Sequence, residues 1–321
     1  MHFAFTPDQL ELADAVRGAL EAECSATVLR EAWDTPQPQL WRLLAELGVL
    51  GISTPQEAGG LGMGAVDWVL ILQEAGRVAL PVPLAETIAG LPALVAAGQT
   101  DQATEILSGE RTLSIVHEGV CTAADTAAAI LSIQGEALHL YDDPQCTRQP
   151  TLDGGRTLYT VQGDTSVISQ DAQAVIDRVT LATSAELLGL GHRVLEMAVD
   201  YAKARTQFSK PIGSFQAVQH HLVDALLKLR FAEPLVYRAA WSMDESDPDR
   251  STHIAMAKIA ASEAASLACR KSLQVHGAIG YTLELDLHMW MKRVWALTHA
   301  WGSPAHHRRT AAKLALGDAH A

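Results

Sequence analysis

Long stretches of helical periodicity in the last part of the chain constrain its fold most strongly. Four candidate helices cover residues 178–207, 214–243, 251–276 and 283–316. Ser251 is a candidate N-cap for the third of these helices, and Gly277 with Gly280 ends it. Because long helices joined by short connections pack as antiparallel neighbours, residues 178–321 are predicted to form a four-helix bundle.

Residues 1–110 are also predicted to be helical, in shorter stretches. Thr6-Pro7-Asp8-Gln9 has the residues of a helix start: a threonine N-cap, a proline at the first helical position, and a glutamine that can return the capping bond. A second helix ends at Gly48, and a glycine-rich turn over 58–64 leads into a third. This part is therefore predicted to be an N-terminal helical domain.

Residues 111–177 have a different pattern, which predicts a small β unit. Ile130–Ile133 and Ala137–Tyr141 are apolar runs on either side of a short turn, as in a β-hairpin. Thr112–Val116 and Thr157–Val161 are further candidate strands. The fold is therefore predicted to be mainly α with a small β domain, in the order helical domain, β domain, helical bundle.

The composition argues against several classes of protein. Lys and Arg number 24 against 37 Asp and Glu, a net charge of −13, so neither nucleic acid nor an anionic membrane is expected as the main partner. The four cysteines form no Cys-x-x-Cys pair, which favours reduced thiols over disulfides or zinc. No run reaches the ~18 apolar residues of a membrane span, and the acidic start is unlike a transit peptide. We therefore expect a cytoplasmic protein.

Two local patterns that suggest ligands have simpler explanations. Gly59–Gly64 is similar to a dinucleotide-binding loop, but no buried strand precedes it, so a connecting loop is expected. The adjacent histidines His220-His221 and His306-His307 point in different directions on a helix. Metal ligands on one helix face need a spacing of three or four. No metal site is predicted from these histidines.

Two longer strings carry more information. Tyr201–Gln216 ends a helix in basic residues, turns, and begins a new helix. Arg205 at that helix end can bind a pyrophosphate with both arms of its guanidinium, or it can simply complement the helix dipole. Gln274–Thr282 contains small residues that let a ligand come close, or that only end a helix. Spacing alone does not decide in favour of a ligand at either string.

Together, these strings resemble the acyl-CoA dehydrogenase family, and the likeness extends over nearly the whole chain. It rests on Phe5–Gln9, Leu47–Ile52, Pro55–Gly62, Tyr201–Gln216 and Gln274–Thr282. The resemblance implies an N-terminal helical domain over 1–110, a reduced middle β domain over 111–177 and a C-terminal four-helix bundle over 178–321. This architecture agrees with the segments predicted above.

The resemblance also implies a reaction in which a glutamate removes the α-proton of an acyl-CoA while hydride passes from the β-carbon to flavin. Trp301 stands where many members of the family carry that glutamate, and Val179 stands at the other position that members use. Neither side chain can abstract a proton. Glu186 and Glu284 are nearby carboxylates, at positions that the family does not normally use.

The resemblance covers only some of the family's cofactor-binding residues. Between 112 and 175 the chain lacks the Thr-Glu-Pro-Gly-Ser-Asp and Trp-Ile-Ser/Thr strings with which family members bind the flavin ring. The retained part is the one that, in the family, reaches across a subunit interface to the ADP half of a neighbour's FAD. By this resemblance it comprises Arg205, Gln207, Phe208, Gln274, Gly277 and Gly280. Ala278 replaces a usual glycine among these contacts.

The resemblance therefore predicts a catalytically incomplete subunit of a heteromeric acyl-CoA dehydrogenase. It is similar to the short subunits of heterotetrameric actinobacterial enzymes that act on steroid-type acyl-CoA thioesters. A full-length partner subunit would carry the catalytic glutamate, and an electron-transferring flavoprotein would accept the electrons. Two alternatives stay open: a self-sufficient homo-oligomeric dehydrogenase with a relocated base, and a structural homologue that binds no flavin.

Overall fold

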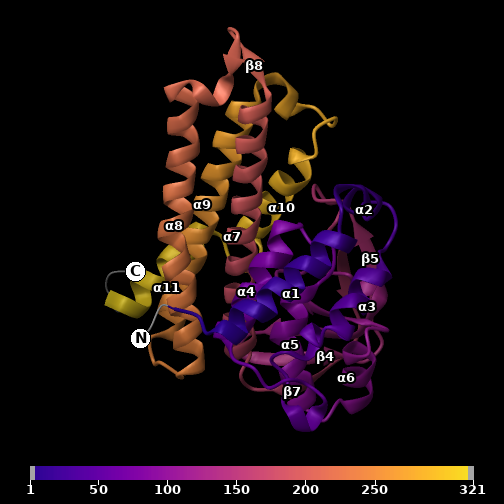
Figure 1. The fold of residues 1–321 in the computed structure, drawn as a ribbon. Coiled ribbons are helices and arrows are strands. Elements are labelled where there is room, and N and C mark those ends of the chain that lie inside the picture. The colour runs from indigo at the N-terminus through magenta and orange to yellow at the C-terminus, as the bar shows by residue number, and fades with distance from the viewer. Residues whose placement is uncertain (1–3, 317–321) are drawn as a thin grey trace.

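The N-terminal part of the computed structural model, which describes residues 4–316, is helical (Figure 1). Its helices are α1 (Pro7–Glu23), α2 (Ala26–Glu31), α3 (Pro38–Glu46), α4 (Ala65–Arg77), α5 (Leu84–Ala96) and α6 (Thr100–Leu107). The predicted start of α1 is confirmed: the Thr6 hydroxyl accepts from the Gln9 backbone N–H at 3.3 Å, and the Gln9 side chain accepts from the Thr6 N–H at 2.9 Å. The helix end at Gly48 is confirmed as well, with φ at 72°.

Two small sheets follow the helical domain. Their strands are β1 (Thr112–Val116), β2 (Cys121–Thr122), β3 (Ala127–Gln134), β4 (Ala137–Tyr141), β5 (Gln145–Gln149), β6 (Leu158–Gln162) and β7 (Thr165–Ser169). One sheet has the order β1-β3-β4-β7, with β1 parallel to β3, and the other has the order β2-β6-β5. The predicted hairpin is confirmed as the antiparallel pair β3–β4, and the strand expected at 157–161 begins one residue later.

The C-terminal part is a bundle of long helices. They are α7 (Gln173–Ala204), α8 (Gln216–Asp244), α9 (Arg250–His276), α10 (Leu287–His299) and α11 (Pro304–Leu316). In Figure 1, α7, α8 and α9 run side by side past the helical domain, up to the hairpin of β8 (Thr206–Gln207) and β9 (Lys210–Pro211). None of the helices within residues 4–316 is both long and apolar enough to cross a membrane.

Two details of the predicted bundle are wrong. The fourth predicted helix is two helices, because Trp301 and Gly302 adopt left-handed backbone conformations, with φ at 58° and 94°, and a right-handed helix cannot continue through them. Ser251 does not cap the third helix. That helix begins at Arg250, and the Ser251 hydroxyl instead donates to Asp177 at 2.9 Å, which ties α9 to the start of α7.

The helical domain and the bundle share one hydrophobic core at the place where α4 crosses α7. A Cβ atom at Gly189 would lie 1.9 Å from the backbone oxygen of Gln73, and one at Gly76 would lie 2.1 Å from that of Glu186. The two helix backbones are therefore closer than any side chain at these positions would allow. This crossing fixes the turn of α7 that carries Glu186.

Candidate functional site

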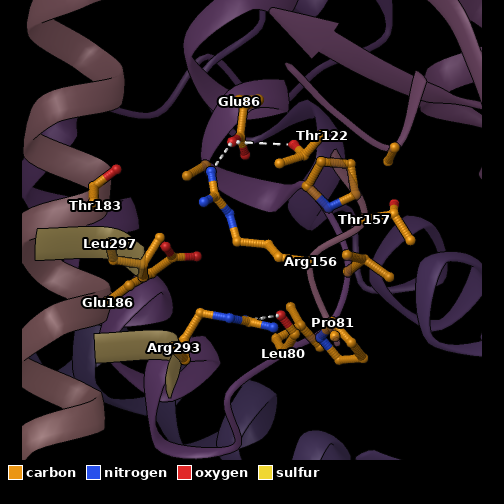
Figure 2. A pocket seen from close by; sticks show the side chains of 15 residues that line it. Leu80, Pro81, Glu86, Thr122, Arg156, Thr157, Thr183, Glu186, Arg293 and Leu297 are labelled. Carbon is orange, nitrogen blue, oxygen red and sulfur yellow. Dashed lines mark hydrogen bonds and ion pairs between the residues drawn. The ribbon is translucent and has the colours of Figure 1, made fainter. Parts of the chain in front are cut away.

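A cavity lies where α7 and α10 face the start of α5 and the loop before β6 (Figure 2). The space between its walls, including the solvent at its open side, is about 420 Å³, and about 30 Å³ of it can hold the centre of a water-sized group. Charged side chains from four elements line it: Glu86 from α5, Arg156 from the loop, Glu186 from α7 and Arg293 from α10. Thr183, about one turn before Glu186 on α7, adds a hydroxyl to the same wall.

Glu86 and Arg156 form an ion pair on one side of the cavity. Arg156 Nη2 donates to Glu86 Oε1 at 3.3 Å, and the hydroxyl of Thr122 donates to the same oxygen at 3.3 Å. Their side chains are only 8% and 18% exposed. Because removing one partner would leave the other as a buried, uncompensated charge, the two side chains are held as a unit.

Arg293 lies on another side of the cavity and is buried. Its Nε donates to Asp153, and its Nη1 donates to the backbone oxygens of Leu80 at 2.7 Å and Ala79 at 3.2 Å. Its third nitrogen, Nη2, is buried without a hydrogen-bond partner among the described residues. A Cβ atom at Gly155 would lie 2.9 Å from Nη2, so the glycine leaves that nitrogen room.

Glu186 points toward the space between Arg156 and Arg293. The described residues make no hydrogen bond to its carboxyl group, whose partial exposure is to the cavity that it lines. Burial, and then the charge of Glu86, raises the pKa of Glu186 to about 7, although Arg293, Arg156 and Lys258 act in the opposite direction. Near neutral pH the carboxyl group therefore exists in both protonation states.

Lys258 on α9 is a second buried group that titrates near neutral pH. Its Nζ donates to the backbone oxygen of Leu297, close to the end of α10, and Leu297 itself lines the cavity. Burial, and then the charge of Arg156, lowers the pKa of Lys258 to about 7, although Glu186 acts in the opposite direction. The amine and the Glu186 carboxyl group therefore influence each other's protonation across the cavity wall.

Trp301, at the first of the two expected base positions, lies in the connection between α10 and α11. Its ring stacks on His117, with 4.7 Å between ring centroids, and its backbone oxygen accepts from His307 Nε2 at 2.8 Å. Burial lowers the pKa of His307 to about 4, so the imidazole is neutral at pH 7 and donates its Nε2–H to this oxygen. An adjacent cavity of about 770 Å³ is lined by Trp301 and His117 and shares Glu86 and Arg156 with the first.

The remaining candidate base positions lie in different surroundings. Val179, at the second expected position, is fully buried on α7 within the hydrophobic core. Glu284 lies in an exposed turn between the 3₁₀ helix Gly277–Tyr281 and α10, and it lines neither cavity. Of the carboxylates that the sequence singled out, Glu186 alone lines the first cavity.

The structure brings the two informative strings together at the β8–β9 end of the bundle (Figure 1). The rings of Tyr201 on α7 and His276 on α9 pack with 4.5 Å between their centroids. Ala198, Ala202 and Val275 form a small buried cluster beside them. We call this end the bundle tip, defined by Arg205, Gln207, Phe208, Gln274, Gly277 and Gly280.

Most of the bundle tip is exposed. Arg205 follows the last residue of α7, and Phe208, in the turn between β8 and β9, is 86% exposed. Gly277 ends α9 with φ at 65°, and no atom lies within 4 Å of the place where its Cβ would be. Arg205, Gln207 and Gln274 present side-chain donors on this surface. Such donors fit the diphosphate and adenosine groups of a dinucleotide.

Sequence reasoning missed most of the charged cavity. Arg156, Lys258 and Arg293 are far apart in the sequence and belong to no motif. The signal that was available is a charge within an otherwise apolar stretch. Lys258 is the single charge within Ile254–Ala261, and Arg293 follows Lys292 within a run of tryptophan, methionine and valine. Such a charge on a helix face that otherwise packs inward indicates a buried polar site.

A helical domain, two small sheets and a long-helix bundle define an acyl-CoA dehydrogenase fold, and the sequence agrees. The chain matches the models of the acyl-CoA dehydrogenase N-terminal domain over residues 6–110 and C-terminal domain over residues 171–316. Acyl-CoA dehydrogenase IpdE2 of Mycolicibacterium smegmatis is 32% identical over 298 residues, which cover 91% of this chain and 94% of the relative. The chain belongs to the acyl-CoA dehydrogenase family, whose members are flavoprotein oxidoreductases.

Solved structures confirm the predicted fold class, mainly α with small β content. The ChsE4–ChsE5 complex from Mycobacterium tuberculosis contains a chain with a TM-score of 0.85 at 25% identity, covering 98% of this chain and 99% of that one. The Tcur3481–Tcur3483 steroid acyl-CoA dehydrogenase gives 0.88 at 23%, with 98% and 99% covered. PigA in complex with FAD gives 0.80 at 18%, with 98% of both chains covered.

Proposed function

We propose that this chain is the catalytically incomplete subunit of a heteromeric, FAD-dependent acyl-CoA dehydrogenase. The bundle tip would bind the ADP half of an FAD whose reactive ring lies in a partner subunit. One observation carries the proposal: Arg205 lies 19 residues beyond Glu186 along the same helix direction. That separation corresponds to about 28 Å at 1.5 Å per residue. A group held at the tip is therefore remote from this chain's own cavity and open to a neighbouring subunit.

The residues of the bundle tip have distinct roles in this proposal. Arg205 donates through two nitrogens to the diphosphate, a planar arrangement that lysine cannot reproduce. Gln207 and Gln274 offer amide donors and acceptors to the adenosine part. Gly277, which has open space around it, lets the ligand approach the backbone. When bound, FAD supplies the flavin that accepts hydride from the acyl β-carbon.

The missing base supports assigning the chemistry to a partner. Trp301 and Val179 occupy both positions where the family carries its glutamate, and neither can take up a proton. Loss of a positioned general base alone typically reduces the rate by about 10²–10⁴-fold. A chain that retains the exposed donors without the base therefore fits the role of a supporting subunit.

The expected partners follow from this assignment. The substrate would be an acyl-CoA, with a steroid-type acyl group as the class that the resemblance implies, and an electron-transferring flavoprotein would receive the electrons. The similar chain in the ChsE4–ChsE5 complex supports an assembly of two different subunits. The stoichiometry that we propose is an α2β2 heterotetramer. The cytoplasm is the location that we propose for this assembly.

The test is Arg205→Ala in the complex with the full-length dehydrogenase encoded beside this chain. Each hydrogen bond to a charged group contributes about 1.5–3 kcal/mol, so loss of the two bonds should lower FAD affinity at least roughly 100-fold. FAD released from the purified complex would be measured by absorbance, and the fold by circular dichroism. The fold should be unchanged because the Arg205 side chain is exposed.

Arg309→Ala on α11 is the matched control, since it removes an exposed arginine of the same kind from a helix that does not contribute to the bundle tip. Its FAD content should equal that of the unaltered complex. Equal FAD content in the Arg205→Ala complex would contradict the proposed role of the tip. Absence of flavin from every preparation, the unaltered complex included, would favour a structural homologue that binds no cofactor.

A second candidate function has one specific observation in its favour. Glu186 lines a cavity, has no hydrogen-bond partner among the described residues and has a pKa raised to about 7, which are the properties of a general base. The chain would then be a self-sufficient dehydrogenase with a relocated base. Glu186→Gln would lower turnover of the isolated chain by at least about 10²-fold, whereas Glu284→Gln, at the exposed turn, would not. Equal turnover of both variants excludes this alternative.

A further inference from the structure

The charged cavity contains two polar groups that lack a partner. Nη2 of Arg293 is a buried donor without an acceptor, and the carboxyl group of Glu186 has no hydrogen bond from the described residues. Buried donors in folded proteins nearly always have an acceptor, so an unpaired one indicates that something outside the chain supplies it. The supporting-subunit function proposed above uses neither group.

The charges around the cavity indicate the kind of ligand that would satisfy these groups. Glu86 is paired with Arg156, and Asp153 with Arg293, so these four charges cancel. Lys258 and Glu186 then decide the net charge. When both are protonated the cluster carries one net positive charge, and when both are deprotonated it carries one net negative charge. A protonated Glu186 is also a donor, in addition to Nη2.

The size of the cavity limits the ligand to a small molecule. The space inside it that can hold the centre of a water-sized group is about 30 Å³, roughly twice the ~10–15 Å³ that one water needs, so the ligand can have only a few heavy atoms. Much of the wall is proline, leucine and threonine, which Figure 2 shows around the two arginines. A planar group with two acceptor oxygens and a short apolar part matches both the donors and the wall.

We propose that this cavity is a binding site for a small monocarboxylate anion, which accepts hydrogen bonds from Arg293 Nη2 and from the protonated carboxyl group of Glu186. Arg156, on the neighbouring wall, adds positive charge close to the anion. The site is separate from the bundle tip and requires no cofactor. In this proposal the cavity binds its own ligand, although the chain lacks the family's catalytic glutamate.

Protonation of Glu186 makes the proposal testable. Between pH 6 and pH 8 the protonated fraction of a group with a pKa of about 7 falls about tenfold. The dissociation constant for acetate, measured by calorimetric titration of the full chain at constant ionic strength, should therefore rise about tenfold over this range. In Glu186→Gln, whose amide donates at every pH, the rise should be less than threefold, which leaves room for the titration of Lys258.

A second variant tests the contact with Arg293 without changing any charge. A Cβ atom at Gly155 would lie 2.9 Å from Nη2, so Gly155→Ala occupies the space beside it and should weaken acetate binding at least tenfold at pH 6. Gly18→Ala is the matched control, because no atom lies within 4 Å of its Cβ position, and it should bind acetate normally.

Three results would overturn the proposal. The first is that acetate at pH 6 binds no better than chloride, a monatomic anion that lacks the two carboxylate oxygens. The second is that Glu186→Gln retains the pH dependence of the unaltered chain. The third is that Gly155→Ala binds acetate as Gly18→Ala does. Because these titrations need neither FAD nor a partner subunit, their outcome is independent of the proposed dehydrogenase role.

Discussion

Lys258 shows how much a single buried residue changes the electrostatics of this protein. Its amine is buried beneath the end of α10 and donates to a backbone oxygen, with no carboxylate bonded to it in the described part of the chain. Desolvation disfavours the charged form, which is why its pKa falls from 10.5 to about 7. The folded chain therefore binds fewer protons than the unfolded chain between these two pKa values.

This difference predicts a pH dependence of stability. Because the unfolded chain binds more protons above pH 7, the contribution of Lys258 to the free energy of unfolding rises with pH. Between pH 7 and pH 8.5 the gain is roughly 1.5 kcal/mol. We expect the Lys258→Met variant to lack this gain in the free energy of unfolding, which urea unfolding at pH 7 and pH 8.5 measures. An equal change with pH in both proteins would show that the lysine is charged in the folded state.

At the scale of elements, the crossing of α4 and α7 determines where Glu186 lies. Gly189 and Gly76 let the two helix backbones touch, and a methyl group at Gly189 would lie 1.9 Å from the backbone oxygen of Gln73. A backbone atom cannot move aside as the end of a flexible side chain can. The crossing therefore depends on glycine for a packing reason, since neither residue has a positive φ.

Replacement of this glycine should be costly. We expect Gly189→Ala to lower the free energy of unfolding by about 2–3 kcal/mol or more, because overpacking of a core forces the helices apart. Gly18→Ala, in open space on α1, should raise it by up to about 1 kcal/mol, since alanine favours the helix. Denaturant unfolding of the two variants measures both changes. Similar stability of the two variants would mean that α4 and α7 are not packed as described.

The elements also show which parts of the structure were predictable from the sequence. The capping box at Thr6 and the hairpin around Gly135 are local patterns, and both were predicted correctly. The break between α10 and α11 was missed, although Gly302 followed by Pro304 is a local helix-stop pattern. The left-handed conformation of Trp301 could not be predicted in this way, because tryptophan rarely adopts it.

The two candidate sites also differ in how far the sequence could predict them. Arg205 and Gln274 lie in strings whose residues are close together in the sequence, and the structure brings these strings together at the bundle tip. The charged cavity collects charged side chains from α5, α7, α10 and a loop, with Lys258 of α9 bonded to Leu297 in its wall, and no spacing in the sequence relates them. Such a cluster becomes visible only once the fold has placed these elements around one space.

At the scale of the whole molecule, the two proposed sites lie apart. In the proposed assembly the exposed donors of the bundle tip would bind a ligand that another subunit also binds, whereas the cavity is lined by helices and loops of this chain. A chain built in this way should have little affinity for FAD when alone, because it contacts only half of the cofactor in the proposed assembly. Binding and turnover should therefore appear together, and only with the partner.

The most direct test of this claim is the flavin content and the dehydrogenase turnover of the chain purified alone, compared with those of its complex with the dehydrogenase encoded beside it. We predict that the isolated chain carries no FAD and no measurable turnover, and that the complex carries FAD and oxidises an acyl-CoA. Stoichiometric FAD together with full turnover in the isolated chain would contradict the account.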